Sequence, residues 1–117
     1  MNKKELEERL IDFSVKIIDI CAHLTKSKAS GIIEGQIIRS GTSCTLNYGE
    51  AIGAESSKDF LHKIQIVLKE LRETYLGLRI LKKAALCELQ PLLDNGIDEN
   101  NQLIGIFVKS VNTLRNS

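Results

Sequence analysis

The sequence predicts an all-α protein, an antiparallel up-and-down four-helix bundle in which residues 1–117 form a single domain. Three observations predict it. Apolar residues recur at alternating spacings of three and four, Pro91 is the only proline, and no stretch has the alternating pattern of a strand. A chain of 117 residues is long enough to bury a core without disulfides or metals. That core should be aliphatic, because 43% of the residues are hydrophobic and only 4% are aromatic.

The first predicted helix spans about residues 3–25 and has the clearest pattern. Its main apolar face follows alternating spacings of four and three, as expected for an amphipathic helix in a bundle. Ile11, Ile18 and Cys21 widen this face on one side. We therefore expect the helix to contact more than one neighbour. The main face comprises Leu6, Leu10, Phe13, Ile17, Ile20 and Leu24.

A break over residues 26–31 precedes the second predicted helix, which spans about residues 30–53. Its middle part, RSGTSCTLNYGEA, is unusual because it is rich in residues that form helices poorly. Each glycine inside a helix costs about 1 kcal/mol relative to alanine. Small residues let helix backbones approach closely, and we expect such packing to offset this cost at Gly41 and Gly49.

The third predicted helix begins at a serine N-cap, Ser56 or Ser57, and ends near residue 88, before Pro91. Besides its main apolar face, it carries a second apolar line in which residues recur every seven positions. Like the first helix, it therefore has apolar surface on two sides. The second line comprises Leu61, Leu68 and Tyr75.

The last predicted helix begins near Asp98, a candidate N-cap, and continues the apolar pattern to the C-terminus. Residues 89–98 are expected to form the connection before it, with Asn95-Gly96 as the turn. Four antiparallel amphipathic helices joined by short links define an up-and-down four-helix bundle.

A line of polar residues on the second helix is the main candidate for a functional site. Its members are three or four residues apart, so their side chains share one side of the helix. Together they could form a hydrogen-bonded network that fixes helix register or a subunit contact, which we favour over a ligand or catalytic site. Glu70 and Glu73 of the third helix could face Arg39, or could pair only along their own helix. The polar line comprises Arg39, Ser43, Asn47 and Glu50.

The charge of the third helix is the second candidate feature. A net charge of +1 excludes a protein that is strongly basic as a whole, yet lysine and arginine are concentrated in this helix. Such a run is usually a solvated helix face, and it could instead meet an anionic partner such as RNA or DNA. The basic stripe comprises Lys58, Lys63, Lys69, Arg72, Arg79, Lys82 and Lys83.

No residue pattern indicates catalysis, a metal or a cofactor. The three cysteines Cys21, Cys44 and Cys87 are widely spaced and form no CxxC motif or Cys/His cluster. Asp59 and His62 form a single D-x-x-H pair, whereas bundle di-metal sites need two Glu-x-x-His motifs and two further glutamates. Phosphate loops and local catalytic motifs are absent as well. We therefore expect a non-enzymatic protein without a metal, a cofactor or a small-molecule substrate.

We expect the chain to be cytoplasmic. Its first ten residues, MNKKELEERL, are charged and lack the apolar segment of a signal peptide. The apolar runs are too short to cross a membrane. An odd number of separated cysteines fits small buried side chains in a reducing compartment.

The stretch RSGTSCTLNYGEAIGAESSKDFLHKIQIVLKELRETY resembles the signature of a known bacterial family. Its members are four-helix-bundle proteins encoded in intervening sequences of 23S ribosomal RNA genes, and they are often labelled ribosomal proteins. The flanking helices match the family only in length and pattern. The matching residues are Arg39, Ser40, Gly41, Thr42, Ser43, Asn47, Tyr48, Glu50, Ala51, Ala54, Glu55, Ser56, Lys58, Asp59, Phe60, Lys63, Lys69, Glu70, Arg72, Glu73, Thr74 and Tyr75.

This resemblance implies a bundle that assembles into a ring-like homopentamer. In a related branch, the accessory proteins of diversity-generating retroelements, a basic pentamer binds nucleic acid and a reverse transcriptase. The chain departs from its relatives at Gly49, where they often carry a basic residue, and at Leu76-Gly77, where they often have Trp-Leu. The first departure removes a positive charge and so weakens the expectation of nucleic-acid binding.

Two functions remain open at this point. The first is a non-enzymatic assembly protein, a homo-oligomer that is expected to be a pentamer. The second is an accessory protein that binds RNA or DNA through the basic stripe and Arg39. The extra apolar surface of the first and third helices favours the first function, since a lone bundle needs only one buried face per helix.

Overall fold

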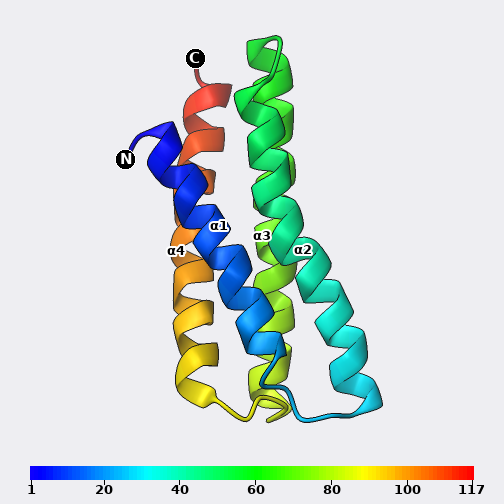
Figure 1. Ribbon diagram of the computed structural model, residues 1–117. Coiled ribbons are helices and arrows are strands. Elements are labelled where there is room, and N and C mark those ends of the chain that lie inside the picture. Colours follow the sequence, from blue (N-terminus) through cyan, green and yellow to red (C-terminus); the bar gives the residue numbers. More distant parts are fainter.

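The computed structural model describes all residues 1–117 and confirms an all-α four-helix bundle (Figure 1). Helix α1 packs against α2 and α4, and α3 also packs against α2 and α4, so that α1 and α3 are diagonal to each other. Both termini and the α2–α3 link lie at one end, and the other two links lie at the opposite end (Figure 1). The helices are α1 (Lys3–Cys21), α2 (Lys28–Ile52), α3 (Ser57–Lys83) and α4 (Gln90–Arg115).

Three of the helices begin at polar side chains that cap free backbone amides. Asn2 accepts a hydrogen bond from the amide of Glu5 at the start of α1, and Ser27 accepts one from the amide of Ser30 at the start of α2. Ser56 caps α3 by accepting from the amide of Asp59, so the first of the two predicted serines is the N-cap. These caps fix where each helix begins.

The predicted boundaries around the α3–α4 link are wrong. Helix α3 ends at Lys83 rather than near residue 88, and Ala85, with a positive φ of 54°, turns the chain away. Pro91 does not end α3 but lies in the first turn of α4, where a missing amide costs nothing. Asn95-Gly96 lies inside α4 rather than in a turn, and Asp98 caps nothing. Helix α1 also ends earlier than predicted, at Cys21.

The two links at the lower end of the bundle in Figure 1 are joined to each other. The amide of Thr25 donates to the carbonyl of Leu86 at 2.8 Å, and the amide of Glu88 donates to the carbonyl of His23 at 2.8 Å. These two bonds form an isolated antiparallel bridge. They satisfy backbone groups that neither helix can pair, and they tie the α1–α2 link to the α3–α4 link.

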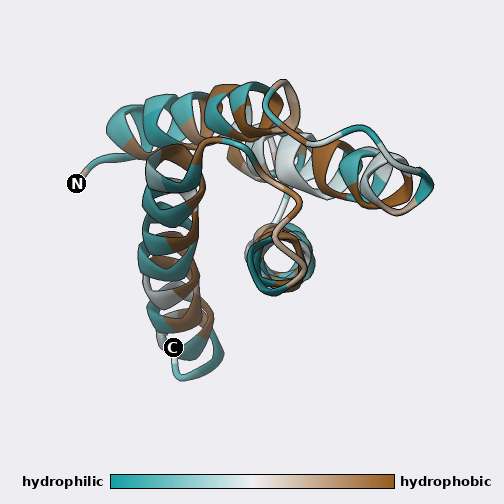
Figure 2. Ribbon diagram, turned by 90° about the horizontal axis from the view of Figure 1, so that it is seen from below, coloured by the Kyte–Doolittle hydropathy of each residue, from teal (hydrophilic) through white to brown (hydrophobic).

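The core lies along the bundle axis and is aliphatic, as predicted. In Figure 2, α4, which ends at the label C, turns its hydrophobic side toward the other helices and its hydrophilic side outward. Phe107 is fully buried, and its ring packs edge-on against the ring of Tyr48 with the ring centres 5.7 Å apart. The other largest fully buried side chains are Leu10, Phe13, Ile17, Ile20, Ile37, Ile64, Leu71, Leu78, Leu81, Leu93 and Leu103.

Glycines mark three places where helices approach closely. A Cβ atom on Gly41 would lie 3.0 Å from Cγ1 of Ile17, which confirms the close packing predicted there. The prediction for Gly49 is wrong, because a Cβ there would meet nothing within 4 Å. Gly77 and Gly96 are close contacts that the sequence did not reveal: a Cβ on Gly77 would collide with Ile37, and one on Gly96 would lie 2.6 Å from Cδ1 of Ile20.

Asn100 is a polar residue inside the core, and replacing it should stabilise the fold. It is fully buried, its Nδ2 donates to the carbonyl of Leu71 at 3.0 Å, and its Oδ1 has no hydrogen-bond partner. Leucine has the same branched shape without the unpaired acceptor, so Asn100→Leu should raise the free energy of unfolding by about 1 kcal/mol. Urea titration measures this, with the exposed neighbour as control: Asn101→Leu should change stability by less than about 0.5 kcal/mol. Equal effects of the two variants would contradict the assignment.

Candidate functional site

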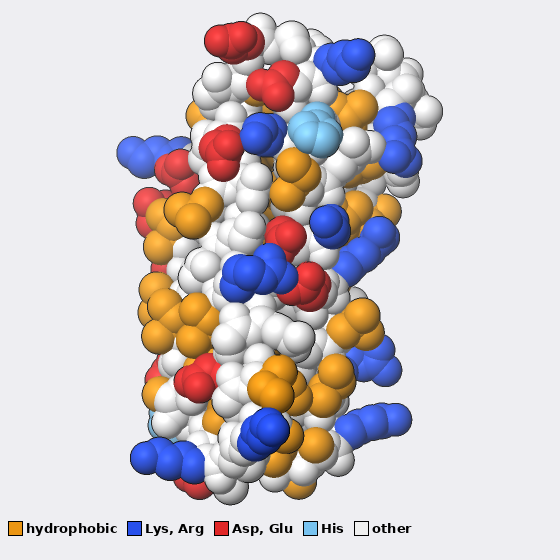
Figure 3. Space-filling view, turned by 90° about the vertical axis from the view of Figure 1, so that its right-hand side faces the viewer, with side chains coloured by type: hydrophobic (Ala, Val, Ile, Leu, Met, Phe, Trp, Pro, Cys, Tyr) orange, Lys and Arg blue, Asp and Glu red, His pale blue; other side chains and the backbone are white.

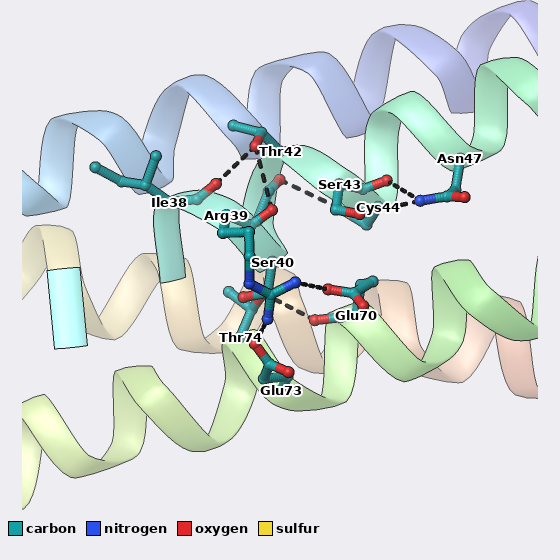
Figure 4. A network of polar contacts seen from close by, with 11 residues as sticks. Ile38, Arg39, Ser40, Thr42, Ser43, Cys44, Asn47, Glu70, Glu73 and Thr74 are labelled. Atoms are coloured by element: carbon teal, nitrogen blue, oxygen red, sulfur yellow. Dashed lines mark hydrogen bonds and ion pairs between the residues drawn. The ribbon is translucent and has the colours of Figure 1, made fainter. Parts of the chain in front are cut away.

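The polar seam between α2 and α3 is centred on Arg39 (Figure 4). Nη1 of Arg39 donates to Oε2 of Glu70 at 3.1 Å, and Nη2 forms an ion pair with Oε2 of Glu73. Glu70 is buried, whereas Arg39 lies at the surface. The charge of Glu70 and then that of Glu73 raise the pKa of Arg39. Of the two alternatives for these glutamates, the structure shows that both face Arg39.

Small hydroxyl residues continue this seam into the bundle. Ser40 and Thr74 are hydrogen-bonded at 2.7 Å between α2 and α3, where both are fully buried (Figure 4). On the other side of α2, Ser14 of α1 bonds to Thr45 at 2.6 Å and donates to the carbonyl of Gly41 at 2.7 Å. The poor helix formers of the second helix therefore bind both neighbouring helices, and their short side chains keep those helices close.

The rest of the predicted polar line does not form one network. Nδ2 of Asn47 donates to the carbonyl and to Oγ of Ser43, at 2.9 and 3.0 Å, within α2 (Figure 4). Glu50 accepts from Nζ of Lys63 at 2.9 Å, and both side chains are outside the core. Arg39 and Glu50 thus have separate partners on α3. Shared spacing placed these residues on one side of α2, but α3 determines which of them meet a partner.

The predicted basic stripe of α3 divides into paired and unpaired cations. Lys63 is paired with Glu50, and Lys82 with Asp94 of α4 at 2.6 Å. The remaining five lie at spacings of eleven, three, seven and four, which place them on one exposed helix face, and none forms an ion pair. Figure 3 shows lysine and arginine side chains along its right-hand edge. We call Lys58, Lys69, Arg72, Arg79 and Lys83 the basic face.

A groove between α3 and α4 adds a further cation to this region. Lys69 and Arg72 line it from α3, together with Arg115 from the last turn of α4. Gln65 and Asn112 supply amides, and the lining contains no carboxylate. Arg115 was not predicted from the sequence, because only the antiparallel pairing of α3 with α4 places it beside residues more than forty positions away.

Two exposed apolar faces lie on diagonal helices. The α1 face consists of Ile11, Val15 and Ile18, of which Val15 is 58% and Ile18 is 52% exposed. The α3 face consists of Leu76 and Ile80, which are 56% and 53% exposed. Figure 3 shows hydrophobic side chains along its left-hand edge, opposite the basic edge, and a further group in its lower half.

The sequence predicted these faces only in part. Ile11 and Ile18 are exposed as extra apolar surface, whereas Cys21 is buried. The second apolar line predicted for the third helix, Leu61, Leu68 and Tyr75, is not an exposed apolar face. Leu68 is buried, Leu61 packs against the core, and Tyr75 is half-buried. Leu76 and Ile80 were missed because their exposure depends on which side of α3 the neighbouring helices leave uncovered.

The three cysteines are free and buried. Burial raises the pKa of the Cys21 thiol to about 12 and that of Cys44 to about 11. Both thiols are therefore protonated at neutral pH, where a protonated thiol is a poor nucleophile and a poor metal ligand. Burial also raises the pKa of Tyr48, and the hydrogen bonds that Arg9 donates to the carboxylate of Glu99 raise the pKa of Arg9.

Asp59 and His62 are not accompanied by further side chains that could bind a metal ion with them. No three His, Cys, Asp or Glu side chains gather where they could hold a metal ion. None of the four helices is long and apolar enough to cross a membrane.

The fold and its paired polar seam define a small all-helical bundle protein. The chain belongs to the family of 23S rRNA-intervening sequence proteins, whose pattern it matches over residues 3–105. It is also similar to a crystal structure from Bacteroides thetaiotaomicron, described as a protein of unknown function from the S23 ribosomal protein family. The two share 26% sequence identity and superpose with a TM-score of 0.82, over 96% of this chain and 99% of that chain. No curated protein matches the sequence.

Proposed function

We propose that this protein is a non-enzymatic assembly protein that forms a homo-oligomeric ring, with five subunits, in the reducing cytoplasm. The observation that carries the proposal is the pair of exposed apolar faces on α1 and α3. A helix in a solitary bundle needs to bury only one side, yet these two helices bury one side and expose apolar residues on another. Covering both faces with further copies would remove this surface from water.

The arrangement of the two faces supports a ring rather than a simple dimer. They lie on diagonal helices, which do not pack against each other. A subunit with two different contact faces binds a neighbour at each, and a repeated contact of this kind closes into a ring when its rotation allows. The number five comes from the resemblance to the family, and the free buried cysteines support a reducing compartment.

Electron microscopy of the purified protein tests this proposal. Averaged particle images should show a closed ring with fivefold symmetry. A closed ring with another symmetry would retain assembly and correct the number of subunits. Particles too small to resolve, at concentrations where the protein is fully folded, would overturn the proposal.

The hydrogen bonds and burial of the candidate polar groups support a non-enzymatic role. Arg39 is bound by two glutamates, and Asn47 donates twice within its own helix. The thiols of Cys21 and Cys44 are held protonated by burial. These groups support helix packing in the way that a structural network does.

The alternative function is binding of RNA or DNA, favoured by the five unpaired cations of the basic face and by Arg115 in the adjoining groove. Each phosphate contact contributes to a salt-dependent affinity. Lys69→Gln should therefore weaken binding of the nucleic acid. It should also reduce the slope of the logarithm of the binding constant against the logarithm of the salt concentration by about one unit.

Fluorescence anisotropy with structured RNA and duplex DNA, at low and at physiological salt, measures this effect. Lys26→Gln is the matched control, because Lys26 is an exposed lysine in the α1–α2 link that does not belong to the basic face. If the unchanged protein binds neither nucleic acid even at low salt, the alternative function is excluded.

A further inference from the structure

We infer that the outer face of α1 in one subunit binds the outer face of α3 in the next, an inference that rests on the proposed assembly. The partner at each apolar face is thus a second copy of this chain, and the contact is head-to-tail.

Acidic residues border the apolar face of α1. Asp12 and Asp19 lie seven residues apart beside Val15 and Ile18, and all four side chains line one shallow groove. Neither aspartate pairs with an arginine or lysine of its own chain. Lys16 also borders this groove, but its ammonium is hydrogen-bonded to Oδ1 of Asn95 on α4. Oδ1 of Asp19 lies 3.8 Å from Nδ1 of His23, and Asp12 has no ion-pair partner. The face therefore presents apolar side chains bordered by two carboxylates that no arginine or lysine neutralises.

Basic residues border the apolar face of α3. Arg79 and Lys83 line a groove with Leu76 and Ile80, and Arg72 precedes Arg79 by seven residues. All three cations are free of ion pairs. A separation of seven residues is about 10.5 Å along a helix. Asp12 and Asp19 therefore have the same separation as Arg72 and Arg79. Val15 and Ile18 lie between the two aspartates, whereas Leu76 lies between the two arginines and Ile80 lies between Arg79 and Lys83.

Charge also excludes the symmetric alternatives. If α1 met α1 of another copy, the aspartates would lie against each other, and if α3 met α3, the arginines would. Like charges at the edge of an apolar contact oppose association, whereas the α1–α3 contact brings opposite charges together. Since α1 and α3 are diagonal within each subunit, such a contact passes from one copy to the next without using the same face twice.

Two aspartate substitutions test the contact, one on each face. Val15→Asp should block the α1 face and Ile80→Asp the α3 face, and each variant alone should give a mass of one chain, 13.0 kDa, by light scattering. Both residues are more than half exposed, so the fold should be kept, which circular dichroism checks. Leu46→Asp is the matched control, because Leu46 is an exposed leucine of α2 outside both faces, at 67% exposure.

Mixing the two monomeric variants gives the decisive result. Each variant retains the face that the other has lost, so an equimolar mixture should form heterodimers of twice the single-chain mass and nothing larger. Two monomeric variants that stay monomeric when mixed would overturn the head-to-tail contact. Val15→Asp and Ile80→Asp variants that assemble as well as the Leu46→Asp protein would also overturn this contact. That result would leave the proposed assembly uncontradicted. A monomeric unchanged protein would contradict the proposed function itself, before any test of the contact faces.

Discussion

Gly77→Ala should lower the free energy of unfolding by about 1–3 kcal/mol, because the added methyl group has no room. Its Cβ would collide with Cγ2 of Ile37, a side chain that is only 1% exposed. This methyl group branches from Cβ of Ile37 and cannot swing aside as the end of a long side chain can. The methyl group would therefore push α2 and α3 apart at this point. Urea titration at fixed protein concentration measures the loss.

Gly49→Ala is the matched control, since it adds the same methyl group within a helix. A Cβ at this position would meet nothing within 4 Å. Alanine forms helices better than glycine, so this variant should gain up to about 1 kcal/mol. The two substitutions should therefore have opposite signs. If Gly77→Ala were neutral or stabilising, the close approach of α2 and α3 at this point would be wrong.

Phe107→Ala should have the largest effect of a single substitution, a loss of about 3–5 kcal/mol. The ring is fully buried and packs edge-on against Tyr48, which lies on the diagonally opposite helix α2. Removing it leaves a cavity between helices that do not otherwise pack together. Thermal unfolding followed by circular dichroism should show a clear drop in melting temperature.

Phe107→Leu separates the loss of volume from the loss of the ring. Leucine fills most of the space, so this variant should lose clearly less stability than Phe107→Ala. Equal losses would mean that the ring contact with Tyr48, rather than the filled volume, accounts for the effect.

The sequence was sufficient to predict the fold, because long amphipathic patterns report which side of each helix is buried. It was misleading at the α3–α4 link, where Pro91 and Asn95-Gly96 were interpreted as a helix end and a turn. Proline is compatible with the first turn of a helix, and Gly96 is required by the neighbouring side chain of Ile20. Only the tertiary packing distinguishes these roles from those of helix breakers.

The sequence could predict only those features of the candidate site that depend on a single helix. The pattern placed Arg39, Ser43, Asn47 and Glu50 on one side of α2, but their partners depend on the alignment of α3. In that alignment, Glu70 and Glu73 both pair with Arg39, and Lys63 pairs with Glu50. For the same reason the apolar pair Leu76 and Ile80 was not predictable, since exposure depends on which sides of α3 its neighbours leave open.

The central claim, that copies of the chain cover each other's apolar faces, is tested most directly by the mass of the unchanged protein in solution. Size-exclusion chromatography with light scattering, at micromolar concentration and physiological salt, should give five times the 13.0 kDa of one chain. A stable mass of 13.0 kDa under these conditions would contradict the account, because Val15, Ile18, Leu76 and Ile80 would then remain open to water.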